Sequence, residues 1–532
     1  MRAHIVGGGF GGLAAAAYLI RNAGIPGPDI TVYEANARMG GSFVLAGDPK
    51  AGYVLPSGSV FDAQFRCTFN LLADIPSTEN PSISVRDEFF AFNTTYPFDD
   101  RARLIDRNGR IVHGPRFGLS LRDGFDLARL ALTPEPLLMG RRIDEFFSEK
   151  FFKGEFWLMY STVMGSLPQH GATELRRYLN RTLHLFPALS DMTGILRTKV
   201  NQYESFIVPL VAWLKEKGVD LQNNVFVRDI GFADEPARIT VNRLDFERGG
   251  TVTSAAIAPE DIVLLTFGSQ ATDLSIGSMD TPPRPRGNGR SWDLWRTLAQ
   301  GRPEFGNPDA FFGAAHVHDS RWVSFTITTQ GRAFIDAMEK LTGSETGRGG
   351  LVSLIDSNWM LSLSVFHHPE VVGQPDDTYL CWGYGLYPEN KGDYIQKPMQ
   401  ECTGREILDE LLRHLRFDGE LGAAVKASTI CIPSDLPYAN NIWLPRKSTD
   451  RPRPVPLGST NLGLIGQYVE MPRDVAFTIE YSARAAWEAI HILLQRGPAP
   501  PPVYQAQFDP KALFAALKVF VCPSTTRPLI RR

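Results

Sequence analysis

The segment from residue 4 to residue 20 constrains the fold of this chain more than any other. A short apolar strand, His4-Ile5-Val6, runs into Gly7-Gly8-Gly9-Phe10-Gly11-Gly12, and an Ala-rich helical stretch follows. In this Gly-x-Gly-x-x-Gly pattern, Gly7 allows a tight turn, Gly9 lets the backbone approach a pyrophosphate, and Gly12 permits close packing of helix on strand. A helix N-terminus also attracts phosphate charge. The segment therefore predicts a Rossmann-type βαβ unit, with Gly11 in the same turn.

A second apolar strand, 30–33, ends at Glu34, which lies 22 residues after Gly12. An acid at about this spacing accepts hydrogen bonds from the ribose hydroxyls of a dinucleotide. The alternative is a glycine turn that serves packing alone. Three glycines, two strands and an acid agree in one unit, which favours nucleotide binding over packing.

The residues after Glu34 distinguish between two dinucleotides. Glu34-Ala-Asn-Ala-Arg38-Met-Gly40-Gly41-Ser42 resembles the Glu-x-x-x-Arg-x-Gly-Gly extension of flavoprotein oxidases and related FAD proteins. The extension favours FAD over NAD and adds Arg38, Gly41 and Ser42 to the candidate cofactor-binding residues.

Two distant segments have the pattern expected of further parts of the same domain. The apolar strand 261–266 enters Gly268-Ser269, where a backbone turn can pass close to a nucleotide. A packing turn explains these two residues equally well. Near the C-terminus, the strand and turn 461–467 end at Gln467, and a helix is expected from about 475 to 494. Its N-terminus is suited to lie against the cofactor.

Composition excludes several classes of protein. The chain has 532 residues, 43% hydrophobic and 21% charged, which is typical of a large globular protein of two to four domains. A formal charge of -3 gives no basic footprint, so we expect no nucleic-acid partner. Five widely spaced cysteines fit neither a disulfide framework nor a metal knuckle. No metal site is expected, because no Asp or Glu at ligand spacing accompanies His367 and His368. A cytoplasmic location is expected, since Met1 leads straight into a strand and no long apolar run appears.

The alternation of short strands and amphipathic helices predicts an α/β fold. We expect a Rossmann-type FAD-binding domain assembled from discontinuous segments, an α+β substrate domain and a small helical C-terminal segment. The expected bounds are 1–75, 191–290 and 425–490 for the FAD-binding domain, 76–190 and 291–424 for the substrate-binding domain, and 491–532 for the C-terminal segment. The segment 76–190 is rich in aromatic residues, which favours a packed helical core over a long apolar cavity.

Several long motifs resemble one family over nearly the whole chain. They are ELRRYLNR (174–181), NQYESFIVPL (201–210), RSWDLWRTLAQGRPEFGNP (290–308), DSNWMLSLSVFHHPE (356–370), CWGYGLYPENKGDYIQKPMQECTGREILDELL (381–412) and GSTNLGLIGQYVEMPRDVAFTIEYSARAA (458–486). These segments look like oleate hydratases, the family once called myosin-cross-reactive antigens. The run at 381–412 is the most specific.

The resemblance implies an activity and a catalytic residue. Members of the family add water across the cis double bond of a free unsaturated fatty acid, typically oleate to a 10-hydroxy acid, with FAD bound and no net redox change. Tyr178 matches the tyrosine that delivers a proton to the alkene. A phenol is a weak acid, so it needs a polarising neighbourhood, for which Arg176, Arg177 and His170 are candidates. Without the resemblance, a helical tyrosine is more often a half-buried core residue.

One departure from the family pattern concerns the catalytic loop. The family has an Arg-Gly-Gly-Arg-Glu-Met-Glu loop whose first glutamate activates water, and here the stretch 56–62 reads PSGSVFD. Alignment through Phe65 and Cys67 places Val60 at the glutamate and Asp62 at the second acid. Valine cannot accept a proton. Either Asp62 takes over, or the flavin and backbone hold the water, or the protein does different or little hydration. The loop's two arginines are also missing, which puts the family's manner of holding FAD in question.

The carboxylate of a fatty acid needs hydrogen-bond donors at one end of an apolar tunnel. By position in the family pattern, PYANNIWLPR (437–446) supplies them, with Asn440 and Asn441 as donors; turn-forming asparagines are the equal alternative. The terminal segment 507–521 could contact a membrane surface peripherally, as the family suggests, or dock on its own protein or a partner subunit. Docking is slightly favoured, and a monomer or a homodimer fits the sequence.

The sequence is also compatible with two other functions. One is a redox flavoenzyme of the amine or carotenoid oxidase type. The other is a catalytically weak fatty-acid-binding relative, for which Val60 is the main argument.

Overall fold

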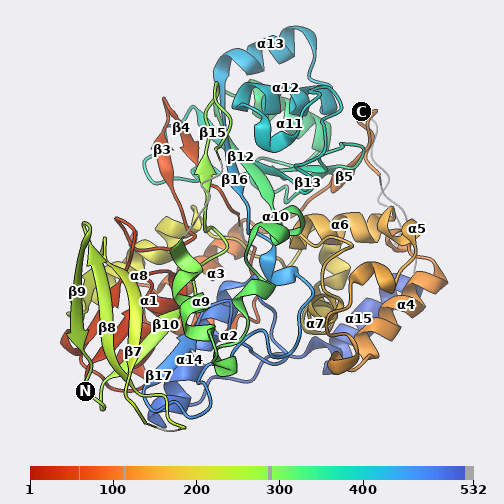
Figure 1. Ribbon diagram of the computed structural model, residues 1–532. Helices are drawn as coiled ribbons and strands as arrows, with labels where there is room; N and C mark the ends of the chain where they lie inside the picture. Colours follow the sequence, from red (N-terminus) through yellow and green to blue (C-terminus); the bar gives the residue numbers. More distant parts are fainter. Residues whose placement is uncertain (59, 113–114, 236, 285–289, 522–532) are drawn as a thin grey trace.

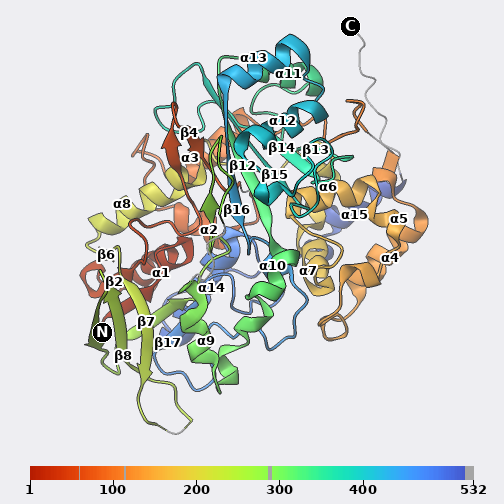
Figure 2. The ribbon, with the colours of Figure 1, turned by 45° about the horizontal axis from the view of Figure 1, so that its top comes forward.

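The computed structural model describes residues 1–58, 60–112, 115–235, 237–284 and 290–521 (Figure 1). Two large sheets dominate it, one parallel and one mostly antiparallel. Helices α4 (Leu121–Leu132), α5 (Glu149–Phe152), α6 (Glu155–Met164), α7 (Ala172–Thr182) and α15 (Pro510–Val521) group at the side of the molecule away from the parallel sheet, as Figures 1 and 2 both show.

The parallel sheet is built from three separate regions of the sequence. Its strand order is β17-β10-β1-β2-β6, and every pair is parallel. The strands are β1 (Ala3–Val6), β2 (Ile30–Tyr33), β6 (Asp220–Gln222), β10 (Ile262–Thr266) and β17 (Leu462–Ile465). Residues of β10 and β17 are buried on both faces, as their near-continuous apolar sequences require.

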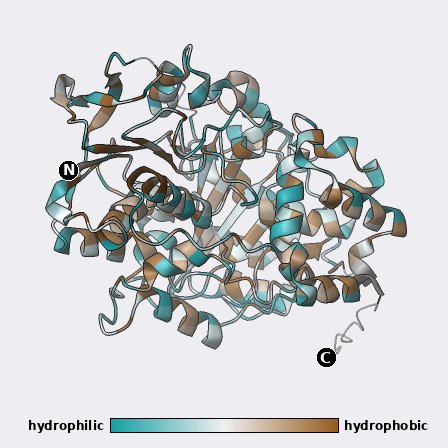
Figure 3. Ribbon diagram, turned by 90° about the horizontal axis from the view of Figure 1, so that it is seen from below, coloured by the Kyte–Doolittle hydropathy of each residue, from teal (hydrophilic) through white to brown (hydrophobic). Residues whose placement is uncertain are grey.

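Alternating side chains of this sheet point to opposite faces, and each face packs against a different layer. Ile5, Val32 and Leu264 pack in one core with the helices on one face. Val6 and Leu265 belong to another core, which the antiparallel strands on the opposite face share. The layers are α1 (Phe10–Arg21), α2 (Arg66–Leu72), α8 (Val208–Glu216) and α14 (Ile479–Leu494) on one side, and β7 (Phe226–Phe232), β8 (Val241–Arg248) and β9 (Thr251–Ala256) on the other. Strands near the N-terminus are among the most hydrophobic parts of the ribbon (Figure 3). The predicted α/β class with a Rossmann-type parallel sheet is confirmed.

The second sheet has seven strands in the order β11-β16-β12-β15-β14-β13-β5. Its pairs are antiparallel except for β13 with β5. The strands are β5 (Leu104–Ile105), β11 (Ser275–Ile276), β12 (Trp322–Gln330), β13 (Val352–Leu354), β14 (Leu361–Val365), β15 (Thr378–Gly385) and β16 (Thr429–Leu436). One face packs on α11 (Ala333–Thr342), α12 (Gly404–His414) and α13 (Gly419–Ser428). The hairpin β3 (Ala46–Asp48) and β4 (Gly52–Val54) lies against β12, where Thr328 Oγ1 accepts a hydrogen bond of 2.9 Å from Tyr53 N.

Sheet membership bears on the expected domain bounds. Strand β11 falls within 191–290 and β16 within 425–490, yet both pair in the seven-stranded sheet. We therefore propose that these two strands belong with the segment 291–424 and not with the nucleotide-binding unit.

The remaining helices lie outside these two sheet layers, and several of them are rich in aromatic contacts. They are α3 (Val85–Thr95), α4 (Leu121–Leu132), α5 (Glu149–Phe152), α6 (Glu155–Met164), α7 (Ala172–Thr182), α9 (Asp293–Ala299), α10 (Ala314–Ser320) and α15 (Pro510–Val521). Phe147 stacks on Phe151 with ring centroids 4.1 Å apart, and Trp157 joins the same core. The aromatic residues of 76–190 therefore pack on one another. Among the described residues, no helix combines the length and apolar character that a membrane crossing needs.

Candidate functional site

The glycine turn has the geometry that the pattern predicts. Gly7 has a φ of +105°, a region that favours glycine, and its N–H donates to Tyr33 O at 2.8 Å. Gly9 is the N-cap of α1 and has no side chain in the way of a ligand. A Cβ on Gly12 would lie 1.9 Å from Gly7 O, so any larger residue there would push the helix off the turn. Residues 7–12 thus form a tight strand-to-helix turn, and the helix N-terminus in it favours an anion.

Glu34 directly follows β2, beside this turn, and is buried. Its Oε2 accepts a hydrogen bond of 2.8 Å from Gly8 N, and its Oε1 accepts from Asn36 N at 2.8 Å and from Asn36 Nδ2 at 2.6 Å. A carboxylate offers about four acceptor positions. The contact from the Asn36 side chain is the one that a ribose hydroxyl can replace without disturbing the backbone.

The Gly40-Gly41-Ser42 loop lies directly on the glycine turn. Gly40 N donates to Gly8 O at 2.9 Å, and a Cβ on Gly41 would lie only 2.8 Å from Gly9 Cα. Two glycine backbones therefore meet where a pyrophosphate is expected. Arg38 does not point into the turn, because its guanidinium donates to Leu45 O and lies 4.9 Å from the centre of the Tyr203 ring.

The distant cofactor candidates lie at the carboxyl ends of β10 and β17, which pair with each other in the same sheet. Gly268 has a φ of +95°, and Ser269 Oγ accepts from Ala271 N at 3.1 Å. Gln467 bridges its strand to α14, donating to Thr478 O at 2.7 Å and accepting from Phe477 N at 2.7 Å. Gln467 therefore holds the helix start in place. Their roles toward a cofactor remain predictions.

Tyr178 lies on α7 in a dry, aromatic environment. Its ring stacks on Trp443 with centroids 4.7 Å apart, and its hydroxyl donates to Ala476 O. Burial raises the pKa of the Tyr178 phenol well above its usual range, and the nearby Tyr160, Glu174 and Asp474 raise it further. The proton is therefore held tightly unless a substrate changes these contacts.

The expected polarising neighbours of Tyr178 have other partners. Arg177 forms ion pairs with Glu135 and Glu470 at 2.9 and 2.6 Å, and Arg176 pairs with Glu135 at 3.2 Å. His170 accepts from Leu167 N at 2.9 Å, and burial lowers the pKa of its imidazole to about 4. None of the three donates a hydrogen bond to the Tyr178 hydroxyl in the described structure. Arg176 and Arg177 can therefore act on Tyr178 only through the field of their ion pairs.

Asp62 pairs with Arg181, which lies one turn along α7 from Tyr178. Arg181 Nη1 donates to Asp62 Oδ2 at 3.1 Å, while His184 Nε2 lies 3.0 Å and Gln64 N 2.9 Å from Asp62 Oδ1. Burial by itself raises the pKa of the Asp62 carboxyl, but the contacts with His184 and Arg181 outweigh it and hold the pKa below its ordinary value. A carboxylate with three donors is a weak base. These contacts favour an anchoring role for Asp62, and its predicted part in catalysis stays a prediction.

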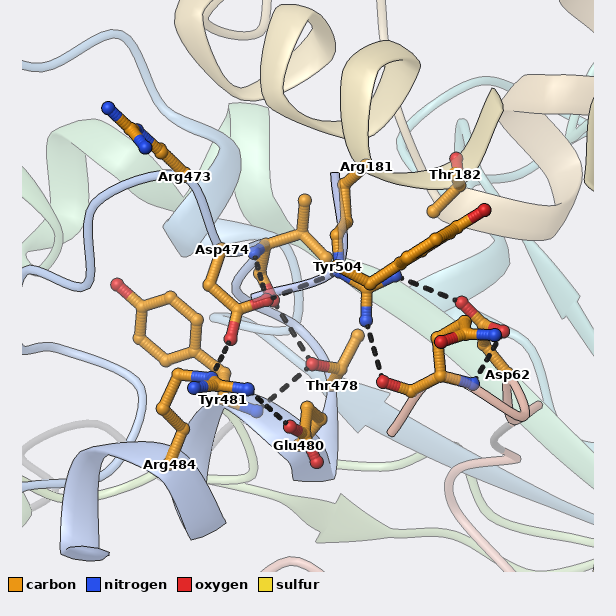
Figure 4. Close-up of polar contacts among 12 residues, drawn as sticks. Asp62, Arg181, Thr182, Arg473, Asp474, Thr478, Glu480, Tyr481, Arg484 and Tyr504 are labelled. Atoms are coloured by element: carbon orange, nitrogen blue, oxygen red, sulfur yellow. Dashed lines mark hydrogen bonds and ion pairs between the residues drawn. The ribbon is translucent and has the colours of Figure 1, made fainter. Parts of the chain in front are cut away.

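The anchor continues into a buried chain of charges (Figure 4). Arg181 Nε lies 3.8 Å from Asp474 Oδ1, and Arg484 bridges Asp474 at 2.9 Å to Glu480 at 3.0 Å. The Glu480 carboxylate in turn accepts from Cys67 N at 3.0 Å and Thr68 N at 2.9 Å, at the N-terminus of α2. This series of ion pairs connects the loop 56–62 to α14, and no sequence motif predicts it. The only sign of it in the sequence is a Glu and an Arg four residues apart in an apolar helix.

The two asparagines of the expected carboxylate site are both fully buried. Asn440 Nδ2 donates to Gly165 O at 2.7 Å, and Asn441 Oδ1 accepts from Tyr468 at 3.1 Å. Asn441 Nδ2 and Trp443 Nε1 have no hydrogen-bond partner among the described residues. Two buried free donors on one turn are costly unless a ligand satisfies them, and Asn441 is therefore better placed than Asn440 to bind a carboxylate.

Comparison with known proteins places the chain in a family. The profile of the MCRA family matches residues 1–491. The chain belongs to the MCRA family. An oleate hydratase of Streptococcus pyogenes serotype M49 (strain NZ131) is 33% identical over 524 residues, covering 97% of this chain and 88% of that protein. A linoleate hydratase of Lactiplantibacillus plantarum is 30% identical, covering 91% and 92%.

The fold of this MCRA family member is shared more widely. Cyclohexylamine oxidase from Brevibacterium oxydans IH-35A aligns with a TM-score of 0.55 at 13% identity, covering 93% of this chain and 98% of that one. Identity this low shows a common fold alone. The resemblance found from the sequence motifs is confirmed by the family match.

The loop that departs from the family pattern lies against the seven-stranded sheet. Pro56 O accepts from Ser324 Oγ of β12 at 2.7 Å, and a Cβ on Gly58 would lie 3.2 Å from the Trp382 ring of β15. Ser59 falls outside the described residues. Val60 is 38% exposed and brings no acid to the loop.

One group of side chains has the arrangement of a metal site. Asp393, Glu410 and His414 bring one ligand atom each within 4.8 Å of one another. The Glu410 carboxylate, however, accepts three backbone N–H bonds, from Asp393, Tyr394 and Ile395, at 2.7 to 2.9 Å. Its oxygens therefore hold the loop before α12 in place.

Proposed function

We propose that this protein is an FAD-dependent hydratase that adds water to the cis double bond of unsaturated free fatty acids, as in the conversion of oleate to 10-hydroxystearate. The observation that carries the proposal is the 33% sequence identity to an oleate hydratase, in an alignment that covers 97% of the chain. In reaction class, the enzyme is a hydro-lyase.

The residues around the glycine turn fit an FAD. Gly7, Gly9, Gly11 and Gly12 would lie along the pyrophosphate, with Glu34 at the adenosine ribose and Gly41 and Ser42 on the opposite side. The close approach of Gly9 and Gly41 leaves room for no side chain, which is what a backbone cradle for phosphate needs. Gly268, Ser269 and Gln467 would contact the rest of the cofactor; the Gln270 side-chain nitrogen is a buried donor with no partner among the described residues. When bound, FAD supplies structure and a fixed electrostatic surface.

The chain's own residues would carry the proton transfer. Tyr178 gives its phenolic proton to one alkene carbon while water attacks the other carbon. A buried, tightly held phenol has this capacity only when the alkene lies within contact of the hydroxyl and charge develops beside it. Asn441, with Asn440 behind it, would bind the fatty acid carboxylate.

We also propose how the protein contacts lipid, where it is located and how many subunits it has. The outer face of the C-terminal segment exposes Phe508, Leu513, Phe514 and Leu517, and we propose that it makes peripheral contact with lipid, from which the substrate comes. Residues 522–532 of this segment lie outside the described residues. Four cysteines are buried free thiols, in keeping with a cytoplasmic location. A monomer or a homodimer is expected.

Incubation with oleate in heavy-oxygen water tests the reaction class. We expect a hydroxy acid that carries one heavy oxygen, detected by mass spectrometry, with no net change in the flavin spectrum. A flavin reduced by substrate, without labelled product, would instead indicate a redox flavoenzyme. Oleate binding without either change would indicate a relative that has lost turnover.

A further inference from the structure

A small pocket lies beside the loop 56–62 and the residues that follow the Gly40–Ser42 loop. Its lining includes Val44, Gly58, Asn201, Tyr203, Phe366 and Glu370. Tyr203 begins a π-helical turn, Tyr203–Ile207, a distortion that is frequent at functional sites. The pocket is thus bounded by the loop that lacks the family glutamate and by the residues that follow the predicted cofactor loop.

Glu370 is the acid of this pocket and is only 8% exposed. Its backbone is fixed: its N–H donates to Gln374 Oε1 at 2.8 Å, and its C=O accepts from Asn201 N at 2.8 Å and Asn201 Nδ2 at 2.9 Å. Within the part of the chain that the structure describes, no recorded hydrogen bond reaches its carboxylate. A carboxyl group that is held in place while its oxygens have no hydrogen-bond partner among the described residues is available to a molecule in the pocket.

The charged groups that act on the Glu370 carboxyl are Arg197, which is positive, and Glu204, which is negative. Arg197 is adjacent to the catalytic loop, because Leu196 and Phe61 exchange backbone hydrogen bonds of 2.8 and 2.9 Å. Burial raises the pKa of the Glu370 carboxyl well above its ordinary value, Glu204 raises it further, and Arg197 only partly opposes this. A carboxylate with a raised pKa is a better base than Asp62, whose pKa is lowered.

We propose that Glu370 is the general base that activates water in this protein, in place of the loop glutamate that Val60 has replaced. The inference rests on the proposed hydratase function. In the step, a water O–H bond breaks and its proton passes to the Glu370 carboxylate as the oxygen bonds to one alkene carbon. The other carbon takes the Tyr178 proton, and the phenolate regains a proton from solvent while Glu370 releases one. Atoms balance and nothing is oxidised or reduced.

The test is steady-state hydration of oleate by the full-length holoprotein. Glu370→Gln should lower kcat by about 100-fold or more, with FAD content and melting temperature unchanged, since general bases contribute roughly 10²- to 10⁴-fold. Glu370→Asp, which keeps the acid on a shorter arm, should retain intermediate activity. Asp62→Asn should cost less in kcat than Glu370→Gln, because Asp62 is already bound by three donors.

The pH profile separates a base from a structural acid. In the wild type, kcat should rise with pH through the raised pKa of Glu370, because only the ionised form accepts a proton, and the residual activity of Glu370→Gln should lack this rise. A Glu370→Gln enzyme with wild-type kcat and an unchanged pH profile overturns the inference alone. A wild-type protein that forms no labelled hydroxy acid overturns the proposed function together with this inference.

Discussion

Replacing Tyr178 with phenylalanine should lower the rate of oleate hydration by about 100-fold or more, with the flavin content unchanged. The substitution removes the phenolic proton and its bond to Ala476 O but keeps the ring, which stacks on Trp443 at 4.7 Å. Positioned acids contribute roughly 10²- to 10⁴-fold to proton transfer. Product formation by mass spectrometry and the flavin absorbance of the purified variant measure the two quantities separately.

Tyr160 provides the matched control. It lies in the same core, and its hydroxyl is buried with no hydrogen-bond partner among the described residues. Removing an unpartnered hydroxyl is close to neutral for stability, so Tyr160→Phe should keep both turnover and flavin. Wild-type turnover in Tyr178→Phe would remove Tyr178 from the mechanism.

Replacing Glu480 with alanine should destabilise the protein by about 3 to 5 kcal/mol, the usual effect of removing one partner of a buried ion pair. The variant leaves the Arg484 guanidinium without its 3.0 Å partner and the N–H groups of Cys67 and Thr68 without their acceptor. The free energy of unfolding in urea, followed by circular dichroism, measures the loss. Glu488→Ala, on a half-buried position of the same helix, should change it by well under 1 kcal/mol.

Equal stability of the two alanine variants would contradict this account of the charge chain. It would mean that water or a neighbouring group satisfies Arg484 as well as Glu480 does.

The nucleotide-binding unit could be predicted from the sequence because its signals are local. Gly7, Gly12 and Glu34 lie within one short βαβ unit, and the conformation of each follows from steric rules that hold in any protein. The strands at 261–266 and 461–467 were also found, since strands buried on both faces are continuous apolar runs.

Long-range contacts were beyond such reasoning. The bonds from Glu480 to the start of α2 span 413 and 412 residues, and no pattern near either end announces them. The sequence shows Asp62 as an acid near the missing glutamate, but its contacts come from Arg181 of α7 and from His184 just after α7, about 120 residues away. The sequence of β16 does not indicate which sheet the strand joins, because a buried strand has the same apolar pattern in either sheet.

Glu370 illustrates the same limit. In the sequence it follows two histidines and a proline in a segment without regular structure. Only the fold brings it beside Gly58 and Tyr203, at the loop where Val60 stands.

Flavin binding tests the central claim most directly. We expect the purified wild-type protein to bind one FAD per chain, measured by absorbance and by titration of added FAD. Gly12→Ala, whose Cβ would meet Gly7 O at 1.9 Å, should bind little or none while remaining folded. Wild-type protein that is colourless and shows no affinity for added FAD would contradict the claim.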